Sequence, residues 1–265
     1  MKLNNTLNVL IMSCLLASGA VTAAEKTAPA FTPEQEARIG EVARDYLLAH
    51  PEVLVEVSQK LQARQQEQQQ QAMTAAVVQN QAALINDKGT PSYGPNDAKV
   101  TVVEFFDYQC IYCARLAPEL DKVIKANPQV RFVFKEFPIF GQRWPESVSA
   151  AKTGLQVWQQ KGADAYLKYH NAIYATGHNE GKLTDEDISA AAKSVKFDAD
   201  NAADVQGTLD GINTLAQQLG FSGTPALVVL PSVGASVDNI SVIPGFTQAA
   251  DLQKAIDKAA SATKK

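Results

Sequence analysis

Two cysteines separated by two residues are the most chemically distinctive feature of this chain. Cys110 and Cys113 lie in the segment VTVVEFFDYQCIYCARLAPELDKVI, residues 100–124. A third cysteine, Cys14, falls in an N-terminal stretch that resembles a secretion signal, so the exported chain would keep only this pair. A disulfide this short closes a very small loop and adds little by constraining the unfolded chain. The pair is therefore interpreted as reactive rather than structural.

Three chemistries use cysteines at this spacing. A structural zinc site needs four ligands, and the chain offers no second cysteine pair, while His50, His170 and His178 are scattered. A c-type haem needs a histidine directly after the second cysteine, where this chain has Ala114. The third chemistry is a redox-active dithiol, which the surrounding sequence favours. We therefore expect no metal and no organic cofactor.

The elements around the pair would place one thiol where it ionises easily. Residues 99–106, KVTVVEFF, form an apolar, β-branched run that predicts a buried strand. From Cys113 onward the apolar residues follow helical spacing, so Cys110 falls at the N-terminus of a helix. The unpaired N–H groups and the dipole at that end stabilise an anion. Because only a thiolate attacks a disulfide, Cys110 is the candidate nucleophile.

Three segments resemble the DsbA-like branch of the thioredoxin superfamily. VVEFFDYQCIYC resembles its strand and active-site pair, GFSGTPALVVL its cis-proline loop and the strand after it, and VIPGFTQAADLQKAI its last strand and helix. The resemblance covers about residues 90–260. It implies an α/β protein with a thioredoxin fold and an inserted helical subdomain, acting as a thiol-disulfide oxidoreductase enzyme.

The resemblance also assigns roles around the thiols. Cys110 matches the nucleophile and Cys113 the cysteine that resolves the mixed disulfide; in the oxidised enzyme the two form the redox-active disulfide. Glu104 matches a buried acid that helps to move protons near the resolving thiol. An outward-facing position on the strand is the alternative for Glu104. Lys135, in RFVFKEFP, is the expected partner of this acid.

Substrate binding is expected at a second, distant segment. Thr224 and Pro225, with Gly223 before them, match the cis-proline loop, whose backbone pairs with a substrate strand beside the active site. Tyr112, between the cysteines, is the remaining candidate for substrate contact. DsbA-type oxidases have Pro-His between their cysteines, whereas this chain has Ile111 and Tyr112. A missing histidine predicts a less acidic thiolate and favours a disulfide isomerase over the alternative, a DsbA-like dithiol oxidase.

Helical segments flank this catalytic region. Residues 141–219 have helical spacing, with Thr184 and Asp187 as a predicted cap, and should form the inserted subdomain. Residues 24–88 are rich in helix formers and should form a separate oligomerisation stalk that precedes a catalytic domain at 89–265. Its first helix begins with a capping box at Thr32 and a second helix should run from residue 51 to about 85, before the Gly/Pro-rich boundary DKGTPSYGPND.

The stalk resembles the N-terminal segment of ScsC-type proteins, and this resemblance implies a homo-oligomer, specifically a trimer. Its apolar stripes have no partner within the segment itself. A hairpin folded on the catalytic domain and a solvated spacer are the alternatives.

Residues 1–23 resemble a cleaved signal peptide ending near Ala23, which predicts a periplasmic protein. The segment IMSC, ending at Cys14, loosely resembles a lipid-attachment site and provides an alternative. The full chain has a net charge of −4, and loss of Lys2 lowers it by one, which argues against nucleic acid as a partner. No later segment is apolar for long enough to insert in a membrane. The expected partners are exported proteins with cysteines and a membrane redox partner. A protein binding copper(I) through both thiols is the alternative from another class.

Overall fold

The computed structural model describes residues 31–262, so the predicted signal peptide lies outside the described residues. The chain divides at Leu61 into two compact units. Between Phe31 and Ala262, none of the helices is both long and apolar enough to span a lipid bilayer.

The first unit is helical and exposes its apolar residues. Helix α1 spans Pro33–Ala49, and Thr32 caps it in a capping box with Gln35, which confirms the predicted helix start. Helix α2 spans Glu52–Gln79 and begins in this unit. No residue of α1 is buried. The large exposed apolar side chains of the two helices, up to residue 57, are Ile39, Val42, Tyr46, Leu47, Leu48, Leu54, Val55 and Val57.

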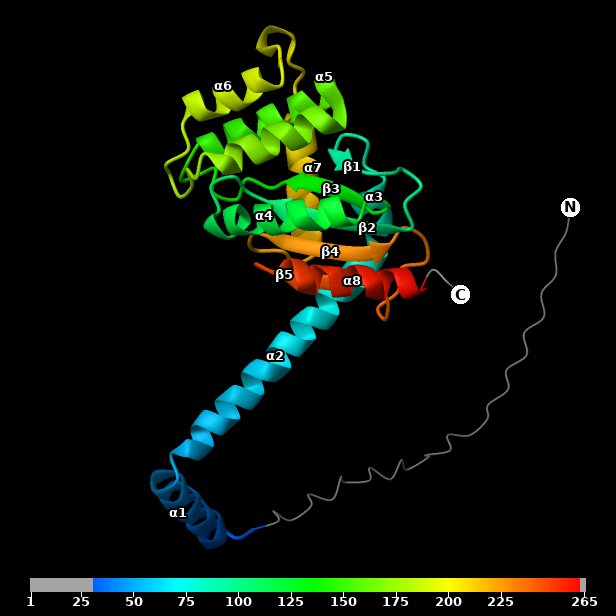
Figure 1. The fold of residues 1–265 in the computed structure, drawn as a ribbon. Helices are drawn as coiled ribbons and strands as arrows, with labels where there is room; N and C mark the ends of the chain where they lie inside the picture. Colours follow the sequence, from blue (N-terminus) through cyan, green and yellow to red (C-terminus); the bar gives the residue numbers. More distant parts are fainter. Residues whose placement is uncertain (1–30, 263–265) are drawn as a thin grey trace, which may run out of the picture. The chain divides into compact units, whose positions relative to one another are not determined.

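A five-stranded sheet forms the centre of the second unit (Figure 1). The strands are β1 Ser92–Tyr93, β2 Val100–Phe106, β3 Arg131–Glu136, β4 Ala226–Pro231 and β5 Ser241–Pro244. Their order across the sheet is β1-β3-β2-β4-β5, and only the β2–β3 pair is parallel. All seven residues of β2 are buried, because the strand is central and both faces of the sheet are covered.

Four helices cover the face of the sheet that carries Val102 and Phe106. They are α4 Ile111–Ala126, α5 Glu146–Ala175, α6 Asp185–Ser194 and α8 Ala249–Ala262. Helix α5 is interrupted at Gly162, whose φ of 76° suits a residue without a side chain. Helix α6 starts at a capping box between Thr184 and Asp187, as its sequence predicts.

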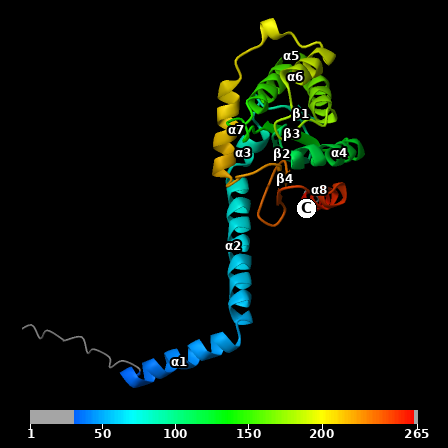
Figure 2. The same cartoon turned by 90° about the vertical axis from the view of Figure 1, so that its left-hand side faces the viewer.

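Helices from two separate parts of the chain cover the opposite face, which carries Val103 and Phe105. They are α7 Gln206–Gln218, α3 Gln81–Ile85 and the last turns of α2. Figure 2 shows α7 and α3 on one side of the sheet and α4 and α8 on the other. The region expected as one inserted subdomain, 141–219, is therefore divided, since α5 and α6 lie on one face and α7 on the other.

The end of the N-terminal helical segment belongs to this second unit. Val77, Leu84 and Ile85 are buried in the same core as Phe105, so residues before position 88 help to build the sheet's cover. The compact unit consequently begins at Leu61, earlier than the boundary placed near residue 88 from the sequence. The predicted single helix to residue 85 is also divided, because α2 ends at Gln79 and α3 follows.

Candidate functional site

The turn between β2 and α4 holds Cys110 at the helix N-cap. Asp107 fixes this turn: its Oδ1 accepts from the Gln109 N–H at 2.8 Å and from the Ser147 hydroxyl at 2.7 Å. Its Oδ2 accepts from the Phe140 N–H at 2.9 Å, and its carbonyl accepts from the Cys110 N–H at 3.0 Å. Two positions distant in sequence, Phe140 and Ser147, are therefore tied to the residues that immediately precede the thiol.

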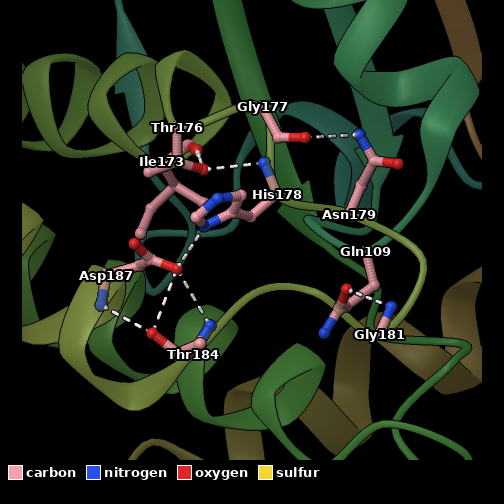
Figure 3. Close-up of polar contacts among 9 residues, drawn as sticks. All are labelled: Gln109, Ile173, Thr176, Gly177, His178, Asn179, Gly181, Thr184 and Asp187. Atoms are coloured by element: carbon pink, nitrogen blue, oxygen red, sulfur yellow. Dashed lines mark hydrogen bonds and ion pairs between the residues drawn. The ribbon is translucent and has the colours of Figure 1, made fainter.

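The loop between α5 and α6 holds the residue next to Cys110. Gln109 is fully buried; its carbonyl accepts from the Glu180 N–H and its Oε1 from the Gly181 N–H, each at 2.9 Å. Figure 3 shows Gln109 beside this loop, where Nδ1 of His178 lies 2.8 Å from Oδ2 of Asp187. Sequence reasoning did not single out Gln109, because its role depends on a loop 72 residues away in the chain.

The cis-proline loop lies directly beside the nucleophile. The Cys110 thiol donates to the Thr224 carbonyl oxygen at 3.2 Å, and the Thr224–Pro225 peptide bond is cis. The Pro225 carbonyl accepts from the Gly245 N–H at 2.7 Å, which ties the loop to the end of β5. Oγ1 of Thr224 is buried and has no well-oriented hydrogen-bond partner among the described residues. The loop and the thiol thus form one site.

The two thiols have opposite acidities. Hydrogen bonding from the Cys113 side chain is the largest effect lowering the pKa of Cys110, to about 6, against the opposing effect of burial. The Thr224 side chain and the backbone N–H groups of Cys113 and Tyr112 lower this pKa further, as the position at a helix N-terminus predicts. Burial raises the pKa of Cys113 well above its usual value, and the bond to Cys110 adds to this rise. Cys110 therefore ionises first, while Cys113 keeps its proton.

Glu104 is buried beneath the thiols, on the face of β2 that α4 covers. It is 2% exposed, and its Oε2 has no hydrogen-bond partner within residues 31–262. Burial, followed by the charge of Cys110, raises the pKa of Glu104 to about 8. The carboxyl group is therefore protonated at neutral pH and can exchange a proton near the thiols. The alternative of an outward-facing strand position is excluded by this burial.

Lys135 is not the partner of Glu104, so that sequence-based expectation is wrong. Phe134 is opposite Glu104 in the sheet, and the next residue, Lys135, points to the other face. Its Nζ lies 3.1 Å from Oδ2 of Asp87 and 3.0 Å from Oγ1 of Thr90. This fully buried lysine thus joins the segment after α3 to β3, and serves the fold rather than the thiols.

Two further candidates for substrate contact lie at accessible positions. The Tyr112 side chain is 52% exposed in the first turn of α4, and the guanidinium carbon of Arg115 lies 5.4 Å from its ring centroid. Gly223 is exposed, with no heavy atom within 4 Å of where a Cβ would lie. Both positions would leave room for a polypeptide, and their roles stay predictions.

A second buried carboxyl group lies near the first and was not singled out from the sequence. Glu136 ends β3, opposite Phe106, and its Oε1 accepts from the hydroxyls of Tyr108 at 3.1 Å and Tyr166 at 2.9 Å. Burial raises the pKa of Glu136 well above its usual value. A Cβ on Gly154 would approach Oε1 of Glu136 to 2.5 Å, so any other residue there would have to displace this carboxyl group. The only sequence signal for Glu136 is an acidic residue at the end of an otherwise apolar strand segment.

Across residues 31–262, no three or more His, Cys, Asp or Glu side chains are grouped so that they could hold a metal ion. Both cysteines of the pair are present as free thiols.

The fold and the site together define a thioredoxin-fold protein with a dithiol at a helix N-terminus, facing a cis-proline loop. The chain belongs to the thioredoxin family, whose family model matches residues 86–233, more than half of the chain. The model for the N-terminal domain of copper resistance protein ScsC matches residues 35–68. ScsC- and DsbA-like members of this family are thiol-disulfide oxidoreductases.

Solved structures agree with this membership. BcfH from Salmonella enterica Typhimurium is 46% identical, with a TM-score of 0.75, and the alignment covers 85% of this chain and 96% of BcfH. Proteus mirabilis ScsC in a transitional conformation is 28% identical, with a TM-score of 0.59, and the alignment covers 88% of this chain and 98% of ScsC.

Among curated proteins, disulfide bond formation protein D of Bacillus subtilis is 26% identical over 188 residues, covering 64% of this chain and 77% of that protein. A Na(+)/H(+) antiporter NhaA of Salinispora tropica is 26% identical over 142 residues, which is only 21% of its length. The chain therefore corresponds to one part of the antiporter and to most of the disulfide bond formation protein.

Proposed function

We propose that this protein is a periplasmic thiol-disulfide oxidoreductase that isomerises disulfides of exported proteins as an oligomer, most simply a trimer. The observation that carries the proposal is the pair of unlike thiols beside the cis-proline loop. Cys110 has a pKa lowered to about 6 and contacts Thr224, while the pKa of Cys113 is raised. Such a pair can attack a substrate from one sulfur and release it with the other.

The first step would be an exchange at Cys110. At neutral pH, above its pKa of about 6, Cys110 is mainly a thiolate. The thiolate attacks one sulfur of a substrate disulfide, a Cys110–substrate bond forms, and the other substrate sulfur leaves as a thiolate. That thiolate attacks a second disulfide of the substrate, a new substrate disulfide forms, and a different substrate thiolate is freed. This thiolate attacks the substrate sulfur bonded to Cys110, Cys110 leaves as a thiolate, and no electrons are gained or lost overall.

Cys113 would end exchanges that do not complete. Its thiol must lose a proton before its sulfur can attack the mixed disulfide, because its raised pKa keeps it protonated. Glu104, with a pKa of about 8, is buried nearby and can accept that proton once ionised. Attack by Cys113 forms the Cys110–Cys113 disulfide and releases the substrate with a reduced thiol.

The isomerase assignment is supported by the helical N-terminal segment. Its apolar side chains on α1 and the start of α2 are exposed in the isolated chain, and the ScsC N-terminal family model matches this segment. Association through these faces would place several Cys110 thiolates around one misfolded client and raise their local concentration. Export is supported by the signal-like residues 1–23, with cleavage near Ala23.

A dithiol oxidase is the second candidate. The low pKa of Cys110 makes it a good leaving group, and a relative is named for disulfide bond formation. In that role the oxidised pair would pass its disulfide to a reduced substrate, and a membrane redox partner would oxidise it again.

Copper(I) binding by the two thiols is a further candidate. Soft thiolates suit copper(I), and the N-terminal family is described as a copper resistance protein. Anaerobic titration against a competing chelator would support this role only if tight binding disappears in a Cys110→Ala/Cys113→Ala variant.

Refolding of a scrambled and of a reduced disulfide protein distinguishes the first two roles. We expect this protein to reactivate the scrambled substrate faster than the reduced one, with the Cys110→Ala variant inactive on both. Faster action on the reduced substrate by the oxidised protein would assign it as an oxidase instead.

A further inference from the structure

A groove of about 550 Å³ lies beside the cis-proline loop. The loop itself, Thr224 and Pro225, forms one end, and residues 219–223 after α7 form one side. Pro244 and Gly245, at the end of β5, lie close to the loop. The remaining wall comes from α2, through residues that belong to the same compact unit as the thiols. A groove of this volume suits a small ligand or a few side chains of a peptide.

Contacts along α2 hold that wall in place. Nε2 of Gln70 donates to the Val242 carbonyl at 3.0 Å, which fixes α2 against the edge strand β5. Two turns further, Val77 is fully buried in the core. Between them, Met73 lies against Gly220, because a Cβ there would be 3.6 Å from its Cγ. The wall is therefore part of the folded catalytic unit.

The chemistry of the lining is apolar and neutral. None of the described residues that line the groove carries a charge. Its apolar members include Ala72, Met73, Ala76, Leu219, Phe221 and Pro225. Glutamine amides and a serine hydroxyl add hydrogen-bonding groups at the rim, which can pair with a peptide backbone. A methionine in such a wall can adapt to side chains of different shape.

The groove continues from the point where a substrate is attached. A polypeptide bonded to Cys110 must pass Thr224, whose carbonyl oxygen lies 3.2 Å from that sulfur and which also lines the groove. An extended chain advances roughly 3.3 Å per residue, so a few residues reach from the sulfur into the groove.

We propose that this groove binds an extended apolar segment of the polypeptide that is joined to Cys110, with Ala72 and Met73 of α2 favouring neutral, apolar side chains. This inference rests on the proposed thiol exchange and adds a substrate preference to it. It also gives the N-terminal helical segment a role in recognition, because one of its own helices forms the wall.

The test follows single exchanges in a Cys113→Ala background. Two peptides carry one cysteine joined by a disulfide to thiopyridine, flanked on both sides by leucine and valine in one and by serine and glycine in the other. The Cys110 thiolate attacks the peptide sulfur, the peptide–pyridyl disulfide breaks, and thiopyridone leaves with a measurable absorbance. Dipyridyl disulfide is small and neutral and carries no peptide, so its rate measures the reactivity of the Cys110 thiolate alone.

Two exposed alanines of α2 give a matched pair of variants. Ala72 lines the groove, whereas Ala75 does not, and both are exposed, so glutamate at either position leaves the core intact. We expect Ala72→Glu to slow the apolar peptide about tenfold, because a charge then opposes burial of apolar groups. The polar peptide and dipyridyl disulfide should keep their rates, and Ala75→Glu should change none of the three. Met73→Ala should slow only the apolar peptide, by a smaller factor.

Equal rates for both peptides in the parent, or an unchanged apolar peptide with Ala72→Glu, would overturn the proposal. A second copy of this chain is the alternative occupant of the groove, and sedimentation of the same variants tests it. A lower oligomeric mass for Ala72→Glu would assign the groove to that second copy, against the proposal. A parent that does not react with dipyridyl disulfide would instead refute the proposed thiol exchange itself.

Discussion

The Cys110 sulfur lies 3.2 Å from the Thr224 carbonyl oxygen, although 114 positions separate the two residues in the chain. As a thiol, Cys110 donates its proton to this oxygen. As a thiolate or a mixed disulfide it cannot, so the carbonyl becomes free to accept a backbone N–H of the substrate. Ionisation of the thiol and exposure of the substrate-binding acceptor are therefore the same event.

The Thr224 hydroxyl should help to set the acidity of Cys110. Thr224→Val keeps the carbonyl and the side-chain shape but removes the hydroxyl, which has no partner beside the neutral thiol, can donate to the thiolate, and lowers the pKa of Cys110. We expect this pKa to rise from about 6 by about half a unit to one unit, the size of one hydrogen bond to a charged group. Thiolate absorbance against pH measures it. Thr214→Val, on an exposed turn of α7, is the control and should leave the titration unchanged.

The two cysteines should differ when each is replaced. Cys113→Ala should accumulate substrate proteins on Cys110 as mixed disulfides, because nothing internal resolves them. Cys110→Ala should trap almost none, since the remaining thiol is fully buried and its pKa is raised. Non-reducing electrophoresis of trapped complexes reads the result. Equal trapping by the two variants would mean that the assignment of nucleophile and resolving thiol is wrong.

Glu104 should control how fast Cys113 resolves a mixed disulfide. In the parent, the resolution rate should rise as the pH passes about 8, where Glu104 ionises and can accept a proton. Glu104→Gln should remove that inflection and slow resolution about tenfold or more. Rapid-quench measurement of mixed-disulfide decay against pH tests this. Glu56→Gln, at an exposed position of α2, is the control and should show the parent's resolution rate at every pH. If Glu104 were only structural, Glu104→Gln would show that rate as well.

The same group should make the fold less stable at higher pH. The folded-state pKa of Glu104 is raised to about 8, so the stability present below the usual value of 4.5 is lost as the pH rises towards 8. The difference corresponds to a cost on the order of 5 kcal/mol. In chemical denaturation of the reduced protein, the free energy of unfolding of Glu104→Gln should therefore rise relative to that of the parent as the pH increases between these values. A purely kinetic role of Glu104 would not produce this difference.

His170 should give the opposite pH dependence. It is buried among aromatic rings, with centroids 5.0 Å from Phe106 and 4.9 Å from Tyr174, and burial lowers its pKa from 6.5 to about 4. Stability is then present above pH 6.5 and is lost as the pH falls to 4, by about 3 kcal/mol. His170→Phe should abolish this loss in chemical denaturation. His178→Gln, at an exposed position, should leave it intact.

The sequence predicts the parts of the site that depend on near neighbours. A change from strand to helical spacing placed Cys110 at a helix N-terminus, and the structure has it as the N-cap of α4. The capping boxes at Thr32 and Thr184 were likewise visible, since each needs only four consecutive residues. The position of Thr224 beside the thiol came from family resemblance, because no local pattern joins segments so far apart.

The sequence could not predict which face a buried polar residue occupies. Strands β2 and β3 are covered on both sides, so their sequences show no alternation that separates Glu104 from Lys135. Their register decides it, and places Glu136 rather than Lys135 on the face of Glu104. The α2 wall of the groove was hidden for a similar reason: a glutamine-rich run gives no periodic signal to indicate a buried side.

The position at which the N-terminal helical segment is cut should decide whether the catalytic unit still folds. A chain that starts at Leu61 keeps the whole compact unit, including Val77, Leu84 and Ile85. A chain that starts at residue 89 loses these three buried aliphatic side chains, each contributing about 1.5–3 kcal/mol, and should be strongly destabilised. We therefore expect only the longer truncation to give a cooperative thermal transition.

That longer truncation separates association from exchange. It should sediment as a monomer, react with dipyridyl disulfide at the parent rate, and lose isomerase activity on a scrambled protein while keeping dithiol oxidase activity. In the full chain, the double variant Ile39→Glu/Val42→Glu should have the same effect as the truncation and give a monomer without isomerase activity. Both residues belong to the exposed apolar set of α1. The pair Gln66→Glu and Gln68→Glu adds the same charge to the polar part of α2 and should leave the oligomer intact. If the monomeric forms isomerise as well as the parent, clustering of thiolates does not explain the activity, and the oxidase assignment becomes the better one.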